Sequence, residues 1–200
     1  MILLFILQFR ERKNMLNAYW DLIFEHNSSQ GDFFSDINSP IYCSTTNLYS
    51  NLVNLNDLYL IDGYYEFLLE YPELVGFNRW LQKNNPMNEP EQTGKTATGY
   101  TPINLSWSGR YWGGLCKSNS PTTYIDGSTQ HTEVWWYSIG SNVEFVTSNG
   151  IPGPCTALSM DSCIIVRHVK LYARIISPTG QNSKFGLKIS PIIGSILLFM

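Results

Sequence analysis

Charge is the scarcest property of this 200-residue chain. Charged residues make up 14% of it, whereas an average soluble protein has about 25%. Its 13 Lys and Arg residues do not exceed its 16 Asp and Glu residues, so it lacks the basic excess of a nucleic-acid-binding protein. The scarcity of Glu, Lys and Arg also argues against a coiled coil or a helical repeat. We therefore expect no nucleic-acid partner.

Long hydrophobic runs are also missing. The apolar run 1–9 and the apolar end of the chain after Lys188 are both shorter than the roughly 20 residues that span a bilayer. In the first run the positive charges follow the apolar residues, the reverse of a secretory signal. The C-terminal tail loosely resembles the signal for a lipid anchor. Membrane association through this tail and packing of the tail on the domain both remain open.

Local signatures of catalysis and metal binding are absent from the sequence. There is no Gly-x-Ser-x-Gly motif, and Gly94-Lys95-Thr96 lacks the preceding glycine of a phosphate-binding loop, since Glu89 stands there. Glu89 and Glu91 would serve a glycosidase only with a matched partner carboxylate. We therefore expect no catalytic residues, no metal site and no cofactor. The alternative is a hydrolase of carbohydrate or peptide whose catalytic residues have no local signature.

The four cysteines form no Cys-x-x-Cys motif, so zinc and thioredoxin-like chemistry are not indicated. They are Cys43, Cys116, Cys155 and Cys163. Cys155 and Cys163 follow a Gly/Pro-rich turn and could pair in an oxidising compartment. Reduced, buried cysteines fit the sequence equally well.

What the chain has in abundance is aromatic residues, which also make up 14%. Residues 64–71 alternate, with Tyr65, Phe67, Leu69 and Tyr71 on one side, which predicts a strand. Residues 164–176 show the clearest alternation of all. Further strands are expected at 100–105, 111–115 and 134–139, with turns at 124–128 and 150–154. Apolar residues at helix-like spacing predict a short helix over 15–25.

This pattern predicts a mainly β fold, a β-sandwich of jelly-roll type with a short N-terminal helix. We divide the chain into an N-terminal flank (1–62), a β-rich module (63–176) and a C-terminal tail (177–200). After Asp161 the chain contains bases but no acids. This basic edge either faces an anionic membrane or glycan or, as we prefer, forms a solvated strand face.

A binding site is predicted where aromatic rings meet glycines and polar groups. Residues 107–114 place two Trp, one Tyr and one Arg beside three glycines, and flat rings beside hydrogen-bonding groups suit a shallow sugar or peptide site. The same rings could equally be buried in the core. The predicted ligand-binding residues are Trp107, Arg110, Trp112, Asp126 and Trp136.

An ordered series of short motifs adds a resemblance over about 63–176. The motifs are the segment 63–72, Asn78–Gln82, Asn85-Pro86, Gly99–Ile103, Trp112–Leu115, Asp126–Ser128, Trp136–Gly140 and Ile151–Pro154. The series resembles β-rich modules of surface or secreted proteins, with discoidin-like and fibrinogen-related modules nearest in character. That resemblance implies adhesion or carbohydrate binding without catalysis.

Together these observations predict a non-catalytic binding module for a glycan or a cell-surface protein. The alternative from another class is a structural surface protein without a small ligand. The expected location is extracellular or at the cell surface, and cytoplasmic if no export signal is used.

Overall fold

The computed structural model describes residues 19–31, 34, 48–89, 96–107, 112–117, 123–127, 139–141, 150–155 and 163–175. Within these residues the secondary structure consists of strands and three short 3-10 helices. The helices are η1 (Leu52–Asn54), η2 (Asp57–Tyr59) and η3 (Pro86–Asn88). The mainly β prediction is therefore confirmed.

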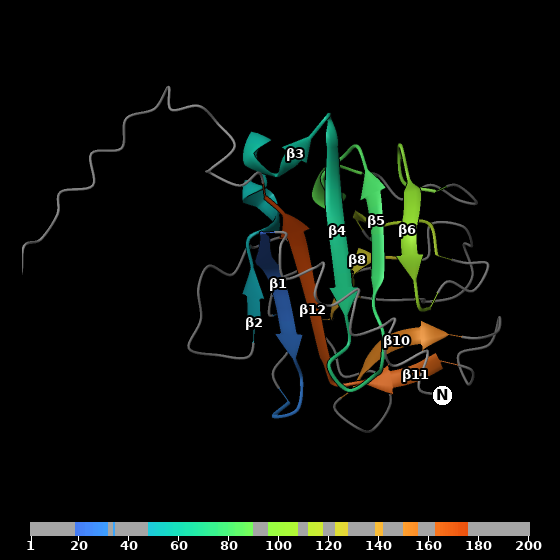
Figure 1. The fold of residues 1–200 in the computed structure, drawn as a ribbon. Coiled ribbons are helices and arrows are strands. Elements are labelled where there is room, and N and C mark those ends of the chain that lie inside the picture. Colours follow the sequence, from blue (N-terminus) through green and yellow to red (C-terminus); the bar gives the residue numbers. More distant parts are fainter. Residues whose placement is uncertain are drawn as a thin grey trace, which may run out of the picture.

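One large antiparallel sheet dominates the structure (Figure 1). Its strands are β1 (Trp20–Asn27), β2 (Leu48–Ser50), β3 (Leu60–Ile61), β4 (Tyr64–Glu70), β5 (Asn78–Gln82), β6 (Thr101–Leu105) and β12 (His168–Arg174). They are ordered β2-β1-β12-β4-β5-β6, and β3 also pairs with β4. The first and last of the described strands, β1 and β12, are thus neighbours. The sheet extends beyond the predicted limits of the β-rich module, because β1, β2 and β3 precede residue 63.

Two smaller sheets complete the described structure. One contains β7 (Cys116–Lys117), β8 (Thr123–Asp126) and β9 (Ile139–Ser141), and the other pairs β10 (Ile151–Cys155) with β11 (Cys163–Val166). In Figure 1, β8 lies behind the large sheet, and β10 and β11 lie below β5 and β6. The finer prediction of a closed sandwich or jelly roll stays a prediction.

The strands predicted at β4 and β12 are confirmed, but burial alternates only along β12. In β4, Tyr65, Phe67 and Leu69 join the core as expected, whereas Glu66 and Leu68 on the other side are buried as well. Along β12, Val169, Leu171 and Ala173 are fully buried, whereas the residues between them are partly exposed. Leu171 pairs with Leu69 of β4, which places the apolar residues of both strands on the same face of the sheet. The strand predicted over 164–176 is divided at Arg167 into β11 and β12.

The helix predicted over 15–25 is wrong in its described part, because Trp20–Asn27 forms β1. The helix-like spacing has a local cause. The pairing of β1 with β12 shifts its register between Leu22 and Phe24. An extra residue at such a shift interrupts the period of two, so that neighbouring Ile23 and Phe24 are both buried. Residues 15–18 lie outside the described part of the chain.

Three other expectations require correction. Of the turn predicted at 124–128, residues 124–126 lie in the strand β8. The turn predicted at 150–154 lies mostly in β10, where Pro152 is opposite Ile165 beside a register shift. Proline is tolerated at such irregular or edge positions because it donates no hydrogen bond to the ladder.

The strand predicted at 111–115 is not formed by its described residues 112–115, and β7 begins only at Cys116. Gly114 has φ +93°, which is incompatible with an extended strand. The strand predicted at 134–139 is described only at Ile139.

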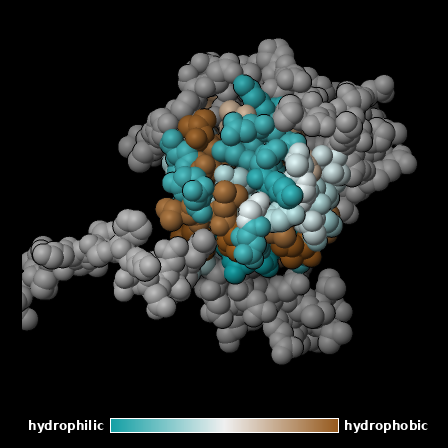
Figure 2. Space-filling view, turned by 90° about the horizontal axis from the view of Figure 1, so that it is seen from above, coloured by the Kyte–Doolittle hydropathy of each residue, from teal (hydrophilic) through white to brown (hydrophobic). Residues whose placement is uncertain are grey.

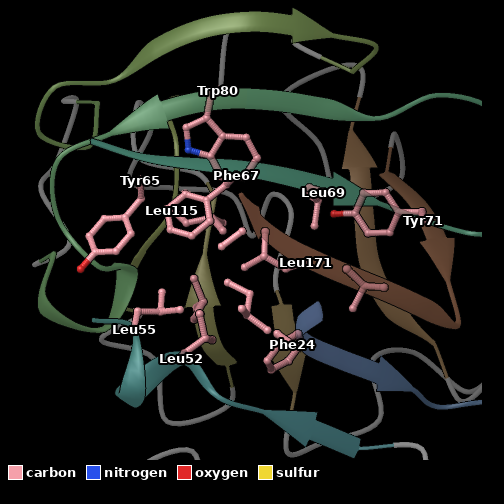
Figure 3. Packing of buried hydrophobic residues seen from close by; sticks show 14 of the residues in the cluster. Phe24, Leu52, Leu55, Tyr65, Phe67, Leu69, Tyr71, Trp80, Leu115 and Leu171 are labelled. Carbon is pink, nitrogen blue, oxygen red and sulfur yellow. The ribbon is translucent and has the colours of Figure 1, made fainter. Parts of the chain in front are cut away.

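The hydrophobic core connects all three sheets. Trp80, Phe67 and Leu171 of the large sheet are fully buried in one cluster with Ile125 of β8 and Ile151 of β10. Figure 3 shows Trp80 beside Phe67 toward one end of this cluster and Tyr71 toward the other. The rings of Phe67 and Trp80 have centroids 5.6 Å apart, a favourable distance for aromatic packing.

Candidate functional site

The structure describes three of the five predicted ligand-binding residues. Trp107 follows the end of β6, Trp112 precedes β7, and Asp126 is the last residue of β8. Arg110 and Trp136 lie outside the described residues. For Asp126 the backbone placement alone is described, opposite Cys116 of β7. The two tryptophans can therefore be compared in detail, and they occupy different environments.

Trp112 is part of the core. Its side chain is 3% exposed, and its ring meets the ring of Trp80 edge to face with centroids 4.8 Å apart. Such edge-to-face pairs contribute about 0.5–1.5 kcal/mol beyond the burial of their area. In the described structure Trp112 therefore anchors the segment before β7 to the large sheet.

A buried amide supports the Trp112 region. The side-chain oxygen of Gln82 accepts hydrogen bonds from Trp80 Nε1 (2.9 Å) and from the backbone N–H of Leu115 (3.0 Å). Its nitrogen donates to the carbonyl oxygens of Asn84 (2.8 Å) and Leu115 (3.0 Å). Both donors and both acceptor positions of the amide are thus used. Gln82 fixes residue 115 against β5 although the two segments lie 33 residues apart.

A second polar clamp surrounds Glu89, one of the two carboxylates considered for a glycosidase. Its side chain is 1% exposed and accepts hydrogen bonds from Asn84 Nδ2 (2.8 Å) and Thr98 Oγ1 (2.9 Å). Its carbonyl accepts a further bond from the backbone N–H of Lys117 (2.8 Å). These contacts give Glu89 a structural role in joining three segments. Glu91 lies outside the described residues.

Trp107 is placed differently, at the corner where β6 ends beside the start of β5. Asn78 holds its backbone from both sides: Asn78 Nδ2 donates to the carbonyl of Trp107 (2.9 Å), and the N–H of Trp107 donates to Asn78 Oδ1 (2.9 Å). The ring meets Tyr71 edge to face at 5.2 Å. It is only partly buried against the core. Trp107 thus combines a fixed position with an accessible side-chain surface.

The turn between β4 and β5 closes around the same corner. Phe77 donates its N–H to Ser106 Oγ (3.0 Å), and Ser106 donates its N–H to the carbonyl of Phe77 (3.0 Å). Gly76 has φ +123°, and a Cβ there would come within 2.5 Å of Ser106 and 3.5 Å of the Trp107 ring. Glycine at 76 therefore permits the close approach of the two segments. The neighbouring Val75 is 78% exposed, so an apolar residue adjoins this corner.

The outer face of the large sheet carries paired charges. The carboxylate of Glu66 is buried and contacts both Arg79 (Nε to Oε1, 2.6 Å) and Arg174 (Nη1 to Oε2, 2.7 Å). Glu25 similarly meets His168 Nε2 at 2.7 Å and Lys170 Nζ at 3.3 Å. The bases of β12 therefore already have acidic partners from β1 and β4. This arrangement favours the strand-face interpretation of the basic edge over a free anion-binding surface.

Two partly buried tyrosines have altered acidity. Burial raises the pKa of Tyr100 to about 12, because the phenolate would lose its hydration. Burial, together with the carboxylates of Glu70 and Glu25, raises the pKa of Tyr172 to about 12. Both phenols therefore stay protonated at neutral pH and act there as neutral hydrogen-bonding groups.

Figure 2 views the upper end of the molecule and shows a hydrophilic centre with hydrophobic residues in separate patches. Within the described ranges, no group of three His, Cys, Asp or Glu residues is arranged to hold a metal ion. No helix in that part of the chain is long and apolar enough to cross a membrane.

Comparison of the chain with protein-family models, curated proteins and solved structures found no match.

Sequence reasoning missed the residues that hold Trp107 in place. Asn78 lies 29 residues from Trp107, and Tyr71 comes from the preceding strand region. One sequence feature does point to Asn78. It occupies the inward positions of β5 together with Trp80 and Gln82, and a polar residue on a buried face must find hydrogen-bond partners. The identity of those partners depends on how the strands pair.

Proposed function

We propose that this chain is a non-catalytic binding module whose ligand is a carbohydrate displayed on a cell surface, with Trp107 as the stacking platform. The observation that carries this proposal is the position of Trp107, which is partly exposed but held by Asn78 and Tyr71. A flat ring with an apolar face suits the apolar face of a sugar.

Rigidity of the platform supports the proposal. A side chain that is already held in place loses little conformational entropy when a ligand stacks on it. Two hydrogen bonds fix the Trp107 backbone, and the edge of Tyr71 limits the orientation of its ring. Arg110, three residues further along the sequence, would supply hydrogen-bond donors to sugar hydroxyls. In this proposal Trp112 supports the site as a core anchor.

The proposal includes a sandwich-like packing of the sheets and an extracellular or cell-surface location. The packing is supported by the single core cluster, which takes residues from the large sheet, from β8 and from β10. The location follows from the proposed ligand, since displayed glycans face outward.

An array of immobilised oligosaccharides tests the function with the full chain. We expect selective binding by the natural sequence and an at least tenfold weaker signal for Trp107→Ala and Arg110→Ala. Tyr19→Ala is the matched control, because Tyr19 is another exposed aromatic residue (52% exposed). Tyr19 precedes β1 at the opposite end of the sheet (Figure 1), so its loss should leave binding unchanged.

Circular dichroism and thermal unfolding of each variant separate a lost contact from a lost fold. Full binding by folded Trp107→Ala would exclude this platform. Absence of binding to every glycan by the natural sequence would favour a structural surface protein instead.

A further inference from the structure

Two cysteines lie directly opposite each other in the smallest sheet. β10 and β11 are antiparallel, and their register pairs Cys155 with Cys163. The pairing also joins Ile151 to Val166 and Pro152 to Ile165, with a register shift before Cys155. Seven residues, 156–162, connect the two cysteines along the chain. The sequence spacing alone does not show whether the two cysteines meet. The strand register does, because it places Cys155 and Cys163 at directly opposed positions.

Opposed positions of an antiparallel ladder have the backbone separation that a disulfide needs. Their Cα atoms lie about 4.5 or 5.5 Å apart, depending on whether the pair is hydrogen-bonded. The Cα atoms of disulfide-bonded cysteines are usually about 4.4–6.8 Å apart. Both kinds of opposed pair fall within that range. No shift of the β10 or β11 backbone along its strand is required.

From this register we infer that Cys155 and Cys163 form a disulfide that joins β10 to β11. The step is thiol–disulfide exchange with a low-molecular-weight disulfide such as oxidised glutathione. The two cysteine thiols lose two electrons and two protons and form one S–S bond. The glutathione disulfide accepts the two electrons and the two protons, its S–S bond breaks, and two molecules of reduced glutathione are released.

The disulfide would stabilise the two-stranded sheet of β10 and β11. An isolated two-stranded sheet is only marginally stable in water. Ile151 and Val166 attach this one to the core through fully buried side chains. A disulfide between Cys155 and Cys163 would lower the conformational entropy of the unfolded chain. It would also hold together the end of the two-stranded sheet that lies away from Ile151 and Val166. The third described cysteine, Cys116, is 1% exposed in β7 and serves as an internal control.

Peptide mapping of the full chain in a glutathione redox buffer tests the inference. Free thiols are alkylated, and the protein is then cleaved with trypsin and with cyanogen bromide. Trypsin leaves Cys155 and Cys163 together in peptide 118–167, and cyanogen bromide divides that peptide after Met160. We expect fragments 118–160 and 161–167 to remain joined in most molecules and to separate on reduction. The intact protein should be lighter by two hydrogen atoms.

The other cysteines fall in separate tryptic peptides, Cys43 in 14–79 and Cys116 in 111–117, so wrong pairings are detected directly. Cys116→Ser should keep the linked fragments, whereas Cys155→Ser should lose them and melt at a lower temperature than oxidised natural protein. The inference is overturned if the two fragments separate without reduction, or if either is joined to peptide 14–79 or 111–117. Glycan binding plays no part in this readout, so failure here leaves the proposed function standing.

Discussion

Trp107 and Trp112 belong to one glycine-rich aromatic segment, but the fold treats them in opposite ways. Trp112 is 3% exposed and packs on Trp80 beside the buried amide of Gln82. Trp107 is partly buried, meets Tyr71 and has its backbone held by Asn78. The comparison shows that aromatic density alone does not identify a binding surface. The surroundings of each ring decide whether it stabilises the core or is accessible to a ligand.

The largest expected loss of stability follows from removing the Trp112 ring. Trp112→Ala should lower the free energy of unfolding by about 3–5 kcal/mol, the usual cost of emptying a buried aromatic site. Trp107→Ala should cost about 1–2 kcal/mol, because the ring it removes is only partly buried. Urea denaturation of both variants measures the difference. Equal losses would contradict the distinction between anchor and platform.

The next effect concerns the support of Trp112. Gln82→Ala should cost about 2–3 kcal/mol, because the Leu115 backbone and the Trp80 indole N–H lose their buried partner. Lys83→Ala, at the exposed neighbouring position, is the matched control and should cost about 0.5–1 kcal/mol, because it removes the cation–π contact of Lys83 with the Tyr64 ring. The same denaturation assay applies. A Gln82→Ala loss as small as that of the control would show that the amide does not hold residue 115.

The support of Trp107 gives a smaller loss of stability with a functional consequence. Asn78→Ala removes both hydrogen bonds to the Trp107 backbone and should cost about 1–2 kcal/mol. Because the platform would then be less ordered, glycan binding should weaken while the sheet remains folded. Calorimetric titration alongside thermal unfolding separates the two effects. Unchanged affinity in a folded variant would remove Asn78 from the proposed site.

The last effect is nearly absent at pH 7 and appears only at high pH. The pKa of Tyr100 is about 12 in the folded protein and about 10 in an unfolded chain. Between these values the unfolded chain loses the phenol proton that the folded chain retains, so stability should fall as pH rises from about 10 to 12. Tyr100→Phe should make this decline less steep and leave stability at pH 7 nearly unchanged. A parallel decline in both proteins would show that burial does not keep the Tyr100 phenol protonated in this pH range.

The sequence predicted those parts of the fold that depend on local periodicity. The alternation in Tyr65, Phe67 and Leu69 identified β4 and the face that joins the core cluster, and that in Val169 and Leu171 identified β12. It did not predict that Glu66 and Leu68, on the other face of β4, are buried as well. Periodicity failed at β1, where the register shift buries adjacent Ile23 and Phe24 and imitates helical spacing. It also failed at β10, because prolines that usually mark a turn lie in an irregular strand.

The candidate site was only partly accessible to sequence reasoning. Clustered rings and glycines drew attention to Trp107 and Trp112, but spacing could not say which ring is buried. That distinction depends on Trp80 and Gln82 from β5 on one side and on Tyr71 and Asn78 on the other. The ion pairs also depend on how the strands are ordered, because Glu66 of β4 lies between Arg79 of β5 and Arg174 of β12. Long-range partners follow from strand order, which local patterns do not encode.

Fluorine NMR of the full chain labelled with 5-fluorotryptophan tests the central distinction most directly. Each resonance is assigned by a single Trp→Phe substitution, and the protein is titrated with the oligosaccharide that binds most strongly on the array. The account predicts that the Trp107 resonance shifts with saturation, while the Trp112 resonance stays in place. A shift at Trp112 with none at Trp107 would contradict the account.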